Sequence, residues 1–256
     1  MKFFRRKELR PVWADESRMT QEYRGVWDSE PVLRRFYRDL WGMAMSPVTG
    51  APVVELGGGA GFIRECYPEV ITTDLNRFPS TQLVCNATRL PFETESVGNF
   101  IAVAFFHHCV DPKLLFDEVQ RVLKPGGRFV ILDPYISPLA RLIYTFGTEE
   151  DCDLSEPPFG VTVGKAGVPL LEANIAKATI IFKKNRPLFE RLYPNLRIVA
   201  LDKINLFRHL IAGSCVQKSP FPRCLYPIAA FADSVLEPVS SFTAIALRVV
   251  LEKTEV

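Results

Sequence analysis

Short apolar runs alternate with polar and glycine-containing segments through the first half of this chain. β-Branched and aromatic residues are frequent in these runs, and runs of this length are typical of strands. The near-continuous run at 99–106 is typical of a central parallel strand, which is buried on both faces. Five strands are predicted in this way, within residues 53–56, 70–75, 82–87, 99–106 and 128–133.

Helical spacing of apolar side chains marks two further segments. Residues 32–41 carry such a stripe, which predicts a helix packed against the sheet. Residues 112–123 carry a second stripe, which begins with Pro112 and ends at a Lys-Pro-Gly-Gly stop signal. Strands that alternate with helices predict an α/β fold with a mostly parallel sheet.

The glycine-rich end of the first strand is a candidate binding site. The sequence E-L-G-G-G-A-G at 55–61 describes a strand followed by a turn with almost no side chains. Such a turn lets a ligand lie against the backbone, and a following helix directs its N–H groups toward that ligand. A dinucleotide site requires G-x-G-x-x-G, and its third glycine would stand where this chain has Phe62. The alternatives are a site for another cofactor and a purely structural tight turn.

A carboxylate ends the second strand run. Asp74 follows the glycine turn at about the distance where an acid binds ribose hydroxyls in such folds. A carboxylate suits this role because it can accept hydrogen bonds from two vicinal hydroxyls, and charged acceptors form the stronger bonds. Capping the N-terminus of a helix is the alternative role for Asp74.

Four segments between about residues 50 and 135 resemble one family, in the same order. The glycine turn and Asp74 resemble the cofactor site of class I S-adenosylmethionine-dependent methyltransferases, whose first motif is E-x-G-x-G-x-G. N-A-T-R-L-P-F at 86–92 is similar to the D-A-x-x-L-P-F segment of the methyltransferases typified by ubiquinone and menaquinone biosynthesis enzymes. The most specific match is E-V-Q-R-V-L-K-P-G-G-R-F-V-I-L-D-P at 118–134.

This resemblance implies a Rossmann-like, seven-stranded and mostly parallel sheet with helices on both faces and an antiparallel last strand. One methyltransferase domain is expected over 1–256, with a helical cap at 1–48, a cofactor-binding half at 50–134, a lid insertion at 135–194 and closing strands within 195–256. The runs at 196–201 and 242–251 would form the closing hairpin. The implied cofactor is S-adenosylmethionine, bound by Glu55, Leu56, Gly57, Gly58, Gly59, Gly61, Asp74, Leu75, Asn86, Ala87 and Phe105.

Asn86 departs from the family pattern, which usually has an Asp that accepts a hydrogen bond from the adenine amino group. An amide oxygen also accepts, but without charge assistance. A catalytically silent, S-adenosylmethionine-binding partner subunit is therefore an alternative function. A nicotinamide nucleotide is a second alternative, which the position of the third glycine and the L-P-F and K-P-G-G segments oppose.

Histidines follow the fourth strand run, where this fold places its active centre. His107 or His108 could act as the general base that deprotonates an acceptor, because imidazole titrates near neutrality. The alternatives for each are a contact that orients the backbone and a ring stacked beside the cofactor. His209 lies in an apolar segment and is interpreted as structural. Tyr23 and Trp27 are candidates for cofactor contact from the N-terminal cap, with core packing as the alternative.

The acceptor is expected under the 135–194 insertion, with His107 or His108 on one wall. The acidic stretch at 149–160 contains Pro-Pro and Gly, which predicts a loop. Insertions after the fifth strand lie at the carboxyl edge where open α/β sheets bind ligands, although a solvated loop is the alternative. Apolar and Pro-rich residues at 221–239, with the basic arm at 1–10, favour a small-molecule or lipid-like acceptor.

The composition of the chain and its missing motifs restrict the classes of molecule that it is expected to bind. The net charge of +2 gives no global attraction to nucleic acid, and the chain lacks the Pro-Cys and Asp/Asn-Pro-Pro-aromatic motifs of nucleic-acid methyltransferases. No metal site is recognisable in the sequence.

Six cysteines without a C-x-x-C pair are interpreted as reduced, mostly buried thiols of a cytoplasmic protein. The sequence contains no run with the length of a membrane span and no signal peptide. The basic arm is interpreted as solvated, with weak peripheral membrane contact as the alternative.

Overall fold

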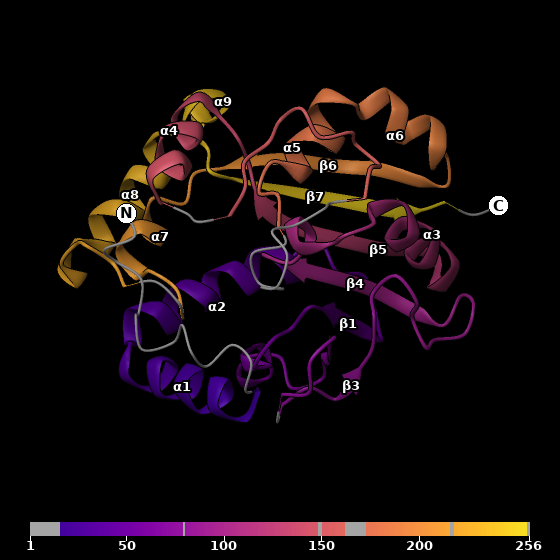
Figure 1. The fold of residues 1–256 in the computed structure, drawn as a ribbon, viewed down its shortest axis with the longest axis horizontal. Coiled ribbons are helices and arrows are strands. Elements are labelled where there is room, and N and C mark those ends of the chain that lie inside the picture. Colours follow the sequence, from indigo (N-terminus) through magenta and orange to yellow (C-terminus); the bar gives the residue numbers. More distant parts are fainter. Residues whose placement is uncertain (1–15, 79, 148–149, 162–172, 216–217, 255–256) are drawn as a thin grey trace.

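The computed structural model describes residues 16–78, 80–147, 150–161, 173–215 and 218–254. Its centre is a seven-stranded sheet in the order β3-β2-β1-β4-β5-β7-β6 (Figure 1). All neighbouring strands pair in parallel except β7, which is antiparallel to both β5 and β6. The strands are β1 (Val53–Leu56), β2 (Ile71–Asp74), β3 (Leu83–Val84), β4 (Val97–Val103), β5 (Leu123–Pro134), β6 (Leu196–Ile204) and β7 (Ala246–Lys253). The predicted seven-stranded, mostly parallel fold is confirmed.

Helices and single helical turns connect these strands. The longer ones are α1 (Glu16–Ser29), α2 (Pro31–Met45), α3 (Pro112–Val122), α4 (Pro138–Gly147), α6 (Arg186–Leu192) and α8 (Tyr226–Val235). The shorter ones are η3 (Phe62–Glu65), η4 (Phe106–His108), α5 (Lys177–Thr179), η6 (Ile180–Lys184), α7 (Arg208–Ala212), η7 (Arg223–Leu225), η8 (Glu237–Val239) and α9 (Ser240–Thr243). The helix predicted at 112–123 begins as expected, with Pro112 in its first turn and the Asp111 carboxylate capping the Leu114 N–H.

Both faces of the sheet are covered, because side chains alternate between the faces along each strand. One face, which includes Phe100 and Phe129, packs against α3 and the α5–α6 region in a single apolar cluster. The opposite face, which includes Ile101 and Val130, packs against Trp41 of α2. The apolar stripe predicted in the N-terminal cap therefore packs on the sheet, and the domain has three layers.

The connection after β1 differs from the prediction. We expected a helix directly after the glycine turn, but residues 62–65 form only one 3-10 turn, η3, before β2 begins at Ile71. The glycine turn takes up residues 57–61 of this crossover, and the chain leaves η3 at Cys66 and reaches β2 at Ile71 without forming an α-helix. Within the described residues, the glycine turn is therefore followed by a 3-10 turn instead of an α-helix, and its own backbone and neighbouring side chains form the candidate site.

Strand boundaries also differ near the predicted site. β4 ends at Val103, earlier than the predicted run at 99–106. Ala104 has a positive φ of 51°, which ends the extended conformation, and residues 106–108 form the turn η4. The two histidines therefore lie in a turn beyond the strand, at the carboxyl edge of the sheet.

Two expectations from composition can be compared with the structure. The cysteines are free thiols, as expected, but only Cys109 is buried, while Cys152 and Cys224 are exposed. The prediction that most of them are buried was therefore wrong, because several lie in surface loops and turns. Within the described ranges, none of the helices has both the length and the apolar character needed to cross a bilayer.

Candidate functional site

The glycine turn follows β1 with three left-handed residues. Gly57, Gly59 and Gly61 have φ angles of 67°, 52° and 69°, which residues with side chains rarely adopt. A Cβ atom on Gly57 would lie 2.0 Å from Cδ2 of Phe105, whereas a Cβ on Gly59 would meet nothing within 4 Å. Gly57 thus leaves space for the Phe105 ring, and Gly59 borders the open space of the site.

Asp74 supports this turn directly. Its Oδ2 accepts a hydrogen bond from the Gly59 backbone N–H at 2.9 Å, and its Oδ1 accepts one from the Asn76 N–H at 2.8 Å. Burial raises the pKa of Asp74, while these backbone N–H groups oppose the shift. A carboxylate has about four acceptor positions, so Asp74 can hold the turn and still accept from a ligand. The sequence indicated only the second of these roles.

Glu55 is buried in the middle of β1. Burial, followed by the charge of Asp74, raises the pKa of Glu55 to about 8. Its Oε2 has no hydrogen-bond partner within the described residues and lies 2.6 Å from the position of a Cβ on Gly58. Burial of Glu55 therefore favours its protonated form, and its carboxyl group lies beneath the turn.

Asn86 follows β3 on an exposed turn. Its Oδ1 accepts from the backbone N–H of Thr88 at 2.9 Å and from the Thr88 hydroxyl at 2.8 Å. Both acceptor positions of the amide oxygen are thereby occupied, so this oxygen can bind adenine only by sharing or exchanging a bond. The adjacent Ala87 is half-buried, and Leu75, after β2, is 67% exposed.

A charged pair from α3 holds the loop after Asn86. The Glu118 carboxylate accepts from the Leu90 N–H at 2.7 Å, and the Arg121 guanidinium donates to the carbonyls of Phe92 and Leu90. Arg121 also pairs with Glu118, and the side-chain hydrogen bond from Arg121 lowers the pKa of Glu118. Sequence reasoning missed this link, although the L-P-F segment and both charged residues belong to segments that it had selected.

His107 lies at the carboxyl edge of β4 with an oriented ring. Its Nδ1 lies 2.9 Å from Oδ1 of Asp133, whose side chain is fully buried at the end of β5. Burial alone lowers the pKa of His107, but the charge and hydrogen bond of Asp133, helped by the charge of Glu150, outweigh it and raise this pKa above the ordinary value. The pairing with Asp133 places a proton on Nδ1 and leaves Nε2 on the opposite side of the ring.

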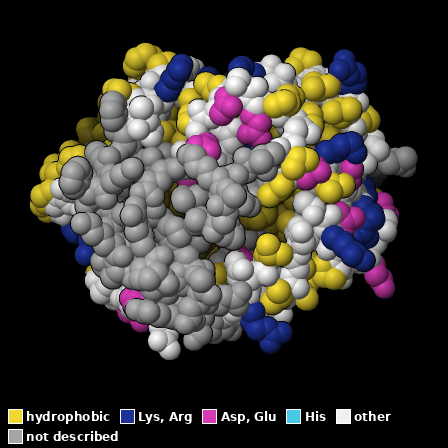
Figure 2. Space-filling view, in the orientation of Figure 1, with side chains coloured by type: hydrophobic (Ala, Val, Ile, Leu, Met, Phe, Trp, Pro, Cys, Tyr) yellow, Lys and Arg dark blue, Asp and Glu magenta, His cyan; other side chains and the backbone are white. Residues whose placement is uncertain are grey.

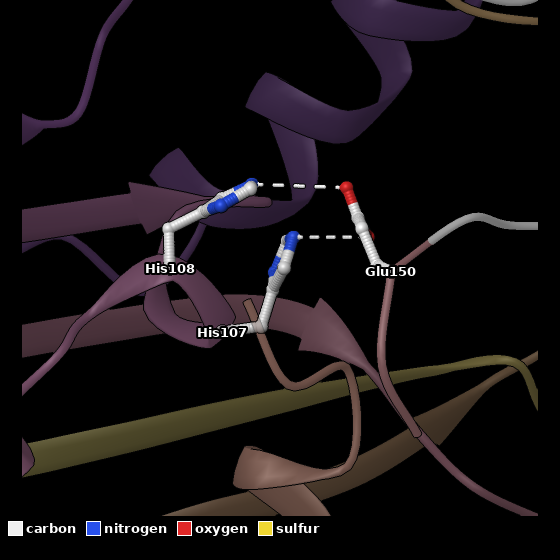
Figure 3. Close-up of side chains that lie close together, drawn as sticks. All are labelled: His107, His108 and Glu150. Atoms are coloured by element: carbon white, nitrogen blue, oxygen red, sulfur yellow. Dashed lines mark ion pairs between the residues drawn. The ribbon is translucent and has the colours of Figure 1, made fainter. Parts of the chain in front are cut away.

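His108 and Glu150 complete a cluster with His107 (Figure 3). The two imidazole rings lie with centroids 4.1 Å apart, and both point toward the Glu150 carboxylate. The distances from Nε2 of His107 and of His108 to the Glu150 oxygens are 3.7 and 4.0 Å. Burial, followed by the charges of His107 and Lys177, holds the pKa of His108 well below its usual range, so this ring is neutral.

The insertion after β5 packs on these histidines. The Asn174 N–H donates to the His107 carbonyl at 3.0 Å, and the Lys177 ammonium donates to the carbonyl of Cys109. Asn174 also accepts from the Asp153 N–H at 3.1 Å, which joins the two described parts of the insertion. Described residues of 135–194 therefore lie against the His107 and His108 turn, while 148–149 and 162–172 are outside the described residues.

Comparison with known proteins finds a family model that matches the segment holding this candidate site. Residues 54–131 match the family model described as "Methyltransferase domain". This segment is therefore of the methyltransferase-domain type, and the sheet around it has the topology expected for class I S-adenosylmethionine-dependent methyltransferases. The matched segment includes the glycine turn, Asp74, Asn86 and both histidines of the turn after β4. S-adenosylmethionine is the cofactor of this family.

Individual relatives are distant. A demethylmenaquinone methyltransferase from Paenarthrobacter aurescens (strain TC1) is 31% identical over 119 residues, a match that spans 40% of this chain and 47% of that relative. The match thus covers less than half of the relative's length. A chain of the Haloferax volcanii complex that contains the Trm112 methyltransferase activator has the same fold, with a TM-score of 0.50 and 14% identity over 93% of this chain and 95% of that one. A SAM dependent methyltransferase from Archaeoglobus fulgidus gives a TM-score of 0.49 and 15% identity, covering 87% of this chain and 93% of that one.

The predicted methyltransferase cofactor residues lie at the ends of four neighbouring strands, β1, β2, β3 and β4. Leu56 is buried at the end of β1, and Gly58 donates its N–H to the Thr73 carbonyl at 2.8 Å, so both fix the turn between β1 and β2. Phe105 lies against Gly57 and links this turn to the histidines that follow it. Asn86 and Ala87 belong to the loop after β3, on the other side of β2.

Three residues from outside this segment were also singled out in the sequence, and two of them are packing residues. Trp27 is 1% exposed, stacks on Phe62 with centroids 4.5 Å apart and donates to Glu65, so it belongs to the core. His209 stacks on Phe36 with centroids 5.2 Å apart, which agrees with a structural role. Tyr23 is half-buried on α1.

Proposed function

We propose that this chain transfers the methyl group of S-adenosylmethionine to a small organic acceptor over the carboxyl ends of β1 and β4. The observation that carries this proposal is the Asp74 carboxylate bonded to the Gly59 N–H beside an open glycine turn. A carboxylate held this way is suited to the cofactor's ribose hydroxyls. β1 and β4 pair in parallel, so the turn after each strand lies at the same edge of the sheet.

The chemistry is displacement at the sulfonium methyl. The cofactor supplies the reactive group, and the protein aligns nucleophile, methyl carbon and sulfur and assists removal of a proton. His107 is our candidate for that assistance, with His108 beside it, because Asp133 orients the His107 ring and raises its pKa toward the working range of a general base. Glu150 and Asn174 extend the acceptor wall from the insertion after β5.

We favour an apolar, lipid-like acceptor, either embedded in a membrane or free in solution. The exposed apolar side chains of the protein support this choice. Figure 2 shows hydrophobic side chains at the left edge and upper left of this face, where Figure 1 places α8, α4 and α9, and further hydrophobic side chains over the right half. Ile228 and Phe231 of α8 are 65% and 70% exposed, and Leu142 of α4 is 58% exposed. We take the exposed apolar side chains of α8 and α4 as the candidate contact surface. Cosedimentation with anionic vesicles, compared with a Phe231→Ser variant, tests this point.

The proposed function is tested in two steps. Calorimetric titration with S-adenosylmethionine, S-adenosylhomocysteine and NAD should give saturable binding of the first two and none of NAD. Incubation with an acceptor panel of phenols, quinols and prenyl-linked alcohols should then release S-adenosylhomocysteine with one acceptor class. Failure to bind either sulfur compound contradicts the proposal. Tight binding without turnover on any acceptor supports the silent partner subunit instead.

A further inference from the structure

Two imidazole nitrogens and a carboxylate converge beside the acceptor wall. Ligand atoms of His107, His108 and Glu150 all lie within 4.8 Å of one another. The side chains come from two segments, since the histidines are consecutive in η4 and Glu150 follows α4 from the insertion (Figure 3). The three residues therefore meet only in the folded protein.

The spacing of these atoms is close to that of a metal site. Bonds of about 2.0–2.2 Å to a tetrahedral ion place ligand atoms roughly 3.4 Å apart. The two distances to the Glu150 oxygens are 3.7 and 4.0 Å, so small side-chain rotations close the difference. Two histidines and one carboxylate are also a donor set of catalytic zinc sites, which keep a fourth position open for water or substrate.

A buried carboxylate orients the first histidine for this role. Asp133 Oδ1 lies 2.9 Å from Nδ1 of His107 and accepts its N–H, which leaves the Nε2 lone pair on the side of His108 and Glu150. A carboxylate behind a ligating histidine is the common outer partner in such sites, because it fixes the tautomer and increases the basicity of the ligand. The Asp133 side chain is completely buried, so solvent does not weaken this contact.

The charges around the cluster favour a cation. Asp133 and Glu150 are carboxylates, and the ammonium of Lys177 is the opposing charge, which acts on both histidines. That ammonium donates to the carbonyl of Cys109, which fixes its position. The two carboxylates and one ammonium around the cluster have a net negative charge, which attracts a divalent cation.

We propose that His107, His108 and Glu150 bind one divalent transition-metal ion, with Zn²⁺ as the reference ion, and that the open position takes a hydroxyl oxygen of the acceptor. This inference rests on the proposed function and narrows its acceptor to a phenol- or enol-like hydroxyl compound. A metal-bound hydroxyl has a lower pKa and loses its proton to solvent. The resulting anion attacks the methyl carbon, the carbon–sulfur bond breaks, and its electron pair neutralises the sulfonium. In this form of the proposed function, His107 assists proton removal as a ligand of the metal ion and not as the general base.

Metal binding is tested on the full chain without an acceptor. Protein treated with a chelator is titrated with Zn²⁺ against a chromophoric competitor, and Co²⁺ provides an absorption spectrum of the ligand field. We expect one equivalent to bind, with Glu150→Gln and His108→Gln each weakening binding more than about tenfold and Asp133→Asn weakening it by about 10- to 100-fold. Asp153→Asn is the matched control, since this exposed carboxylate of the same insertion bonds to Ser155 instead of the histidines.

Folding and cofactor binding are measured on the same samples. Glu150 is partly exposed, so its replacement by Gln should leave the thermal unfolding midpoint unchanged. Absence of stoichiometric Zn²⁺ binding, or equal affinity in wild type, Glu150→Gln and His108→Gln, overturns the metal site. S-adenosylmethionine titrations in parallel test the proposed function separately, because none of these substitutions alters the glycine turn or Asp74.

Discussion

The carboxylate of Asp74 accepts a hydrogen bond from the backbone N–H of Gly59 at 2.9 Å, which ties the end of β2 to the turn that follows β1. Both residues were predicted to bind the cofactor, and the structure connects them before any ligand is considered. A ligand that bonds to Asp74 therefore meets a side chain already held in place, with less freedom to lose on binding.

Replacement of Asp74 by Asn should weaken S-adenosylmethionine binding by about 10- to 100-fold, since hydrogen bonds to a charged acceptor contribute about 1.5–3 kcal/mol. The amide also places a donor where the Gly59 N–H needs an acceptor. Isothermal titration measures the change. Asp117→Asn removes an exposed carboxylate paired with Lys113 and should bind like wild type. Unchanged affinity in the Asp74 variant would show that this carboxylate does not contact the cofactor.

Substitutions in the glycine turn should separate binding from folding. Gly59→Asn should fold, because Asn tolerates the left-handed conformation and the new Cβ meets open space, but should lose cofactor binding. Gly126→Asn is the matched control, since Gly126 also has a positive φ and open space around its Cβ position. Thermal unfolding and calorimetry on both variants check this. Normal cofactor affinity in Gly59→Asn would place the ligand elsewhere.

Gly57 should behave differently from Gly59. A Cβ on Gly57 collides with the Phe105 ring, so Gly57→Ala should lower the thermal unfolding midpoint as well as affinity. The double variant Gly57→Ala/Phe105→Ala removes the obstructing ring and should recover part of the midpoint that the single variant loses. A double-mutant cycle measures this coupling directly. Additive effects in the cycle would mean that Phe105 is not the cause of the loss.

Asn86→Asp should fold normally and change cofactor affinity by about 1 kcal/mol at most, because a carboxylate keeps both bonds from Thr88 and adds charge. Asn86→Ala, which loses the turn, should weaken binding more. Calorimetric titration distinguishes the two variants. A large loss in Asn86→Asp would instead show that the NH₂ group of Asn86 donates to the cofactor.

Glu55 should make stability depend on pH. Its folded pKa of about 8 lies above the ordinary value of 4.5, so the folded state retains a proton that the unfolded state has released. The stabilisation is complete below pH 4.5 and declines toward pH 8, by at most about 1.4 kcal/mol per pH unit. Glu55→Gln imitates the protonated form and should remove this slope. Urea unfolding of both proteins from pH 5 to 9 gives the difference curve, and parallel curves would contradict the shift.

Sequence reasoning succeeded where function depends on neighbouring residues or on a repeated pattern. The glycine turn, Asp74 and the strand runs could be found because their chemistry and spacing are written in consecutive residues. The position of Glu150 could not be found this way, because its contact with His107 depends on how the insertion after β5 folds back. The sequence also could not show that the Asn86 side-chain oxygen accepts a hydrogen bond from Thr88, because such a turn allows several alternative hydrogen bonds.

The place of β7 between β5 and β6 has a consequence for synthesis of the protein. β6 is joined to the sheet through β7, and β7, residues 246–253, is synthesised after the other six strands of the sheet. Until the ribosome has released these residues, the edge of β5 is uncovered and β6 has no partner strand. Two unpaired edges are sites for wrong pairing with other chains. A stop or frameshift before residue 246 therefore removes the strand that joins β6 to β5, although it lies far in sequence from the glycine turn.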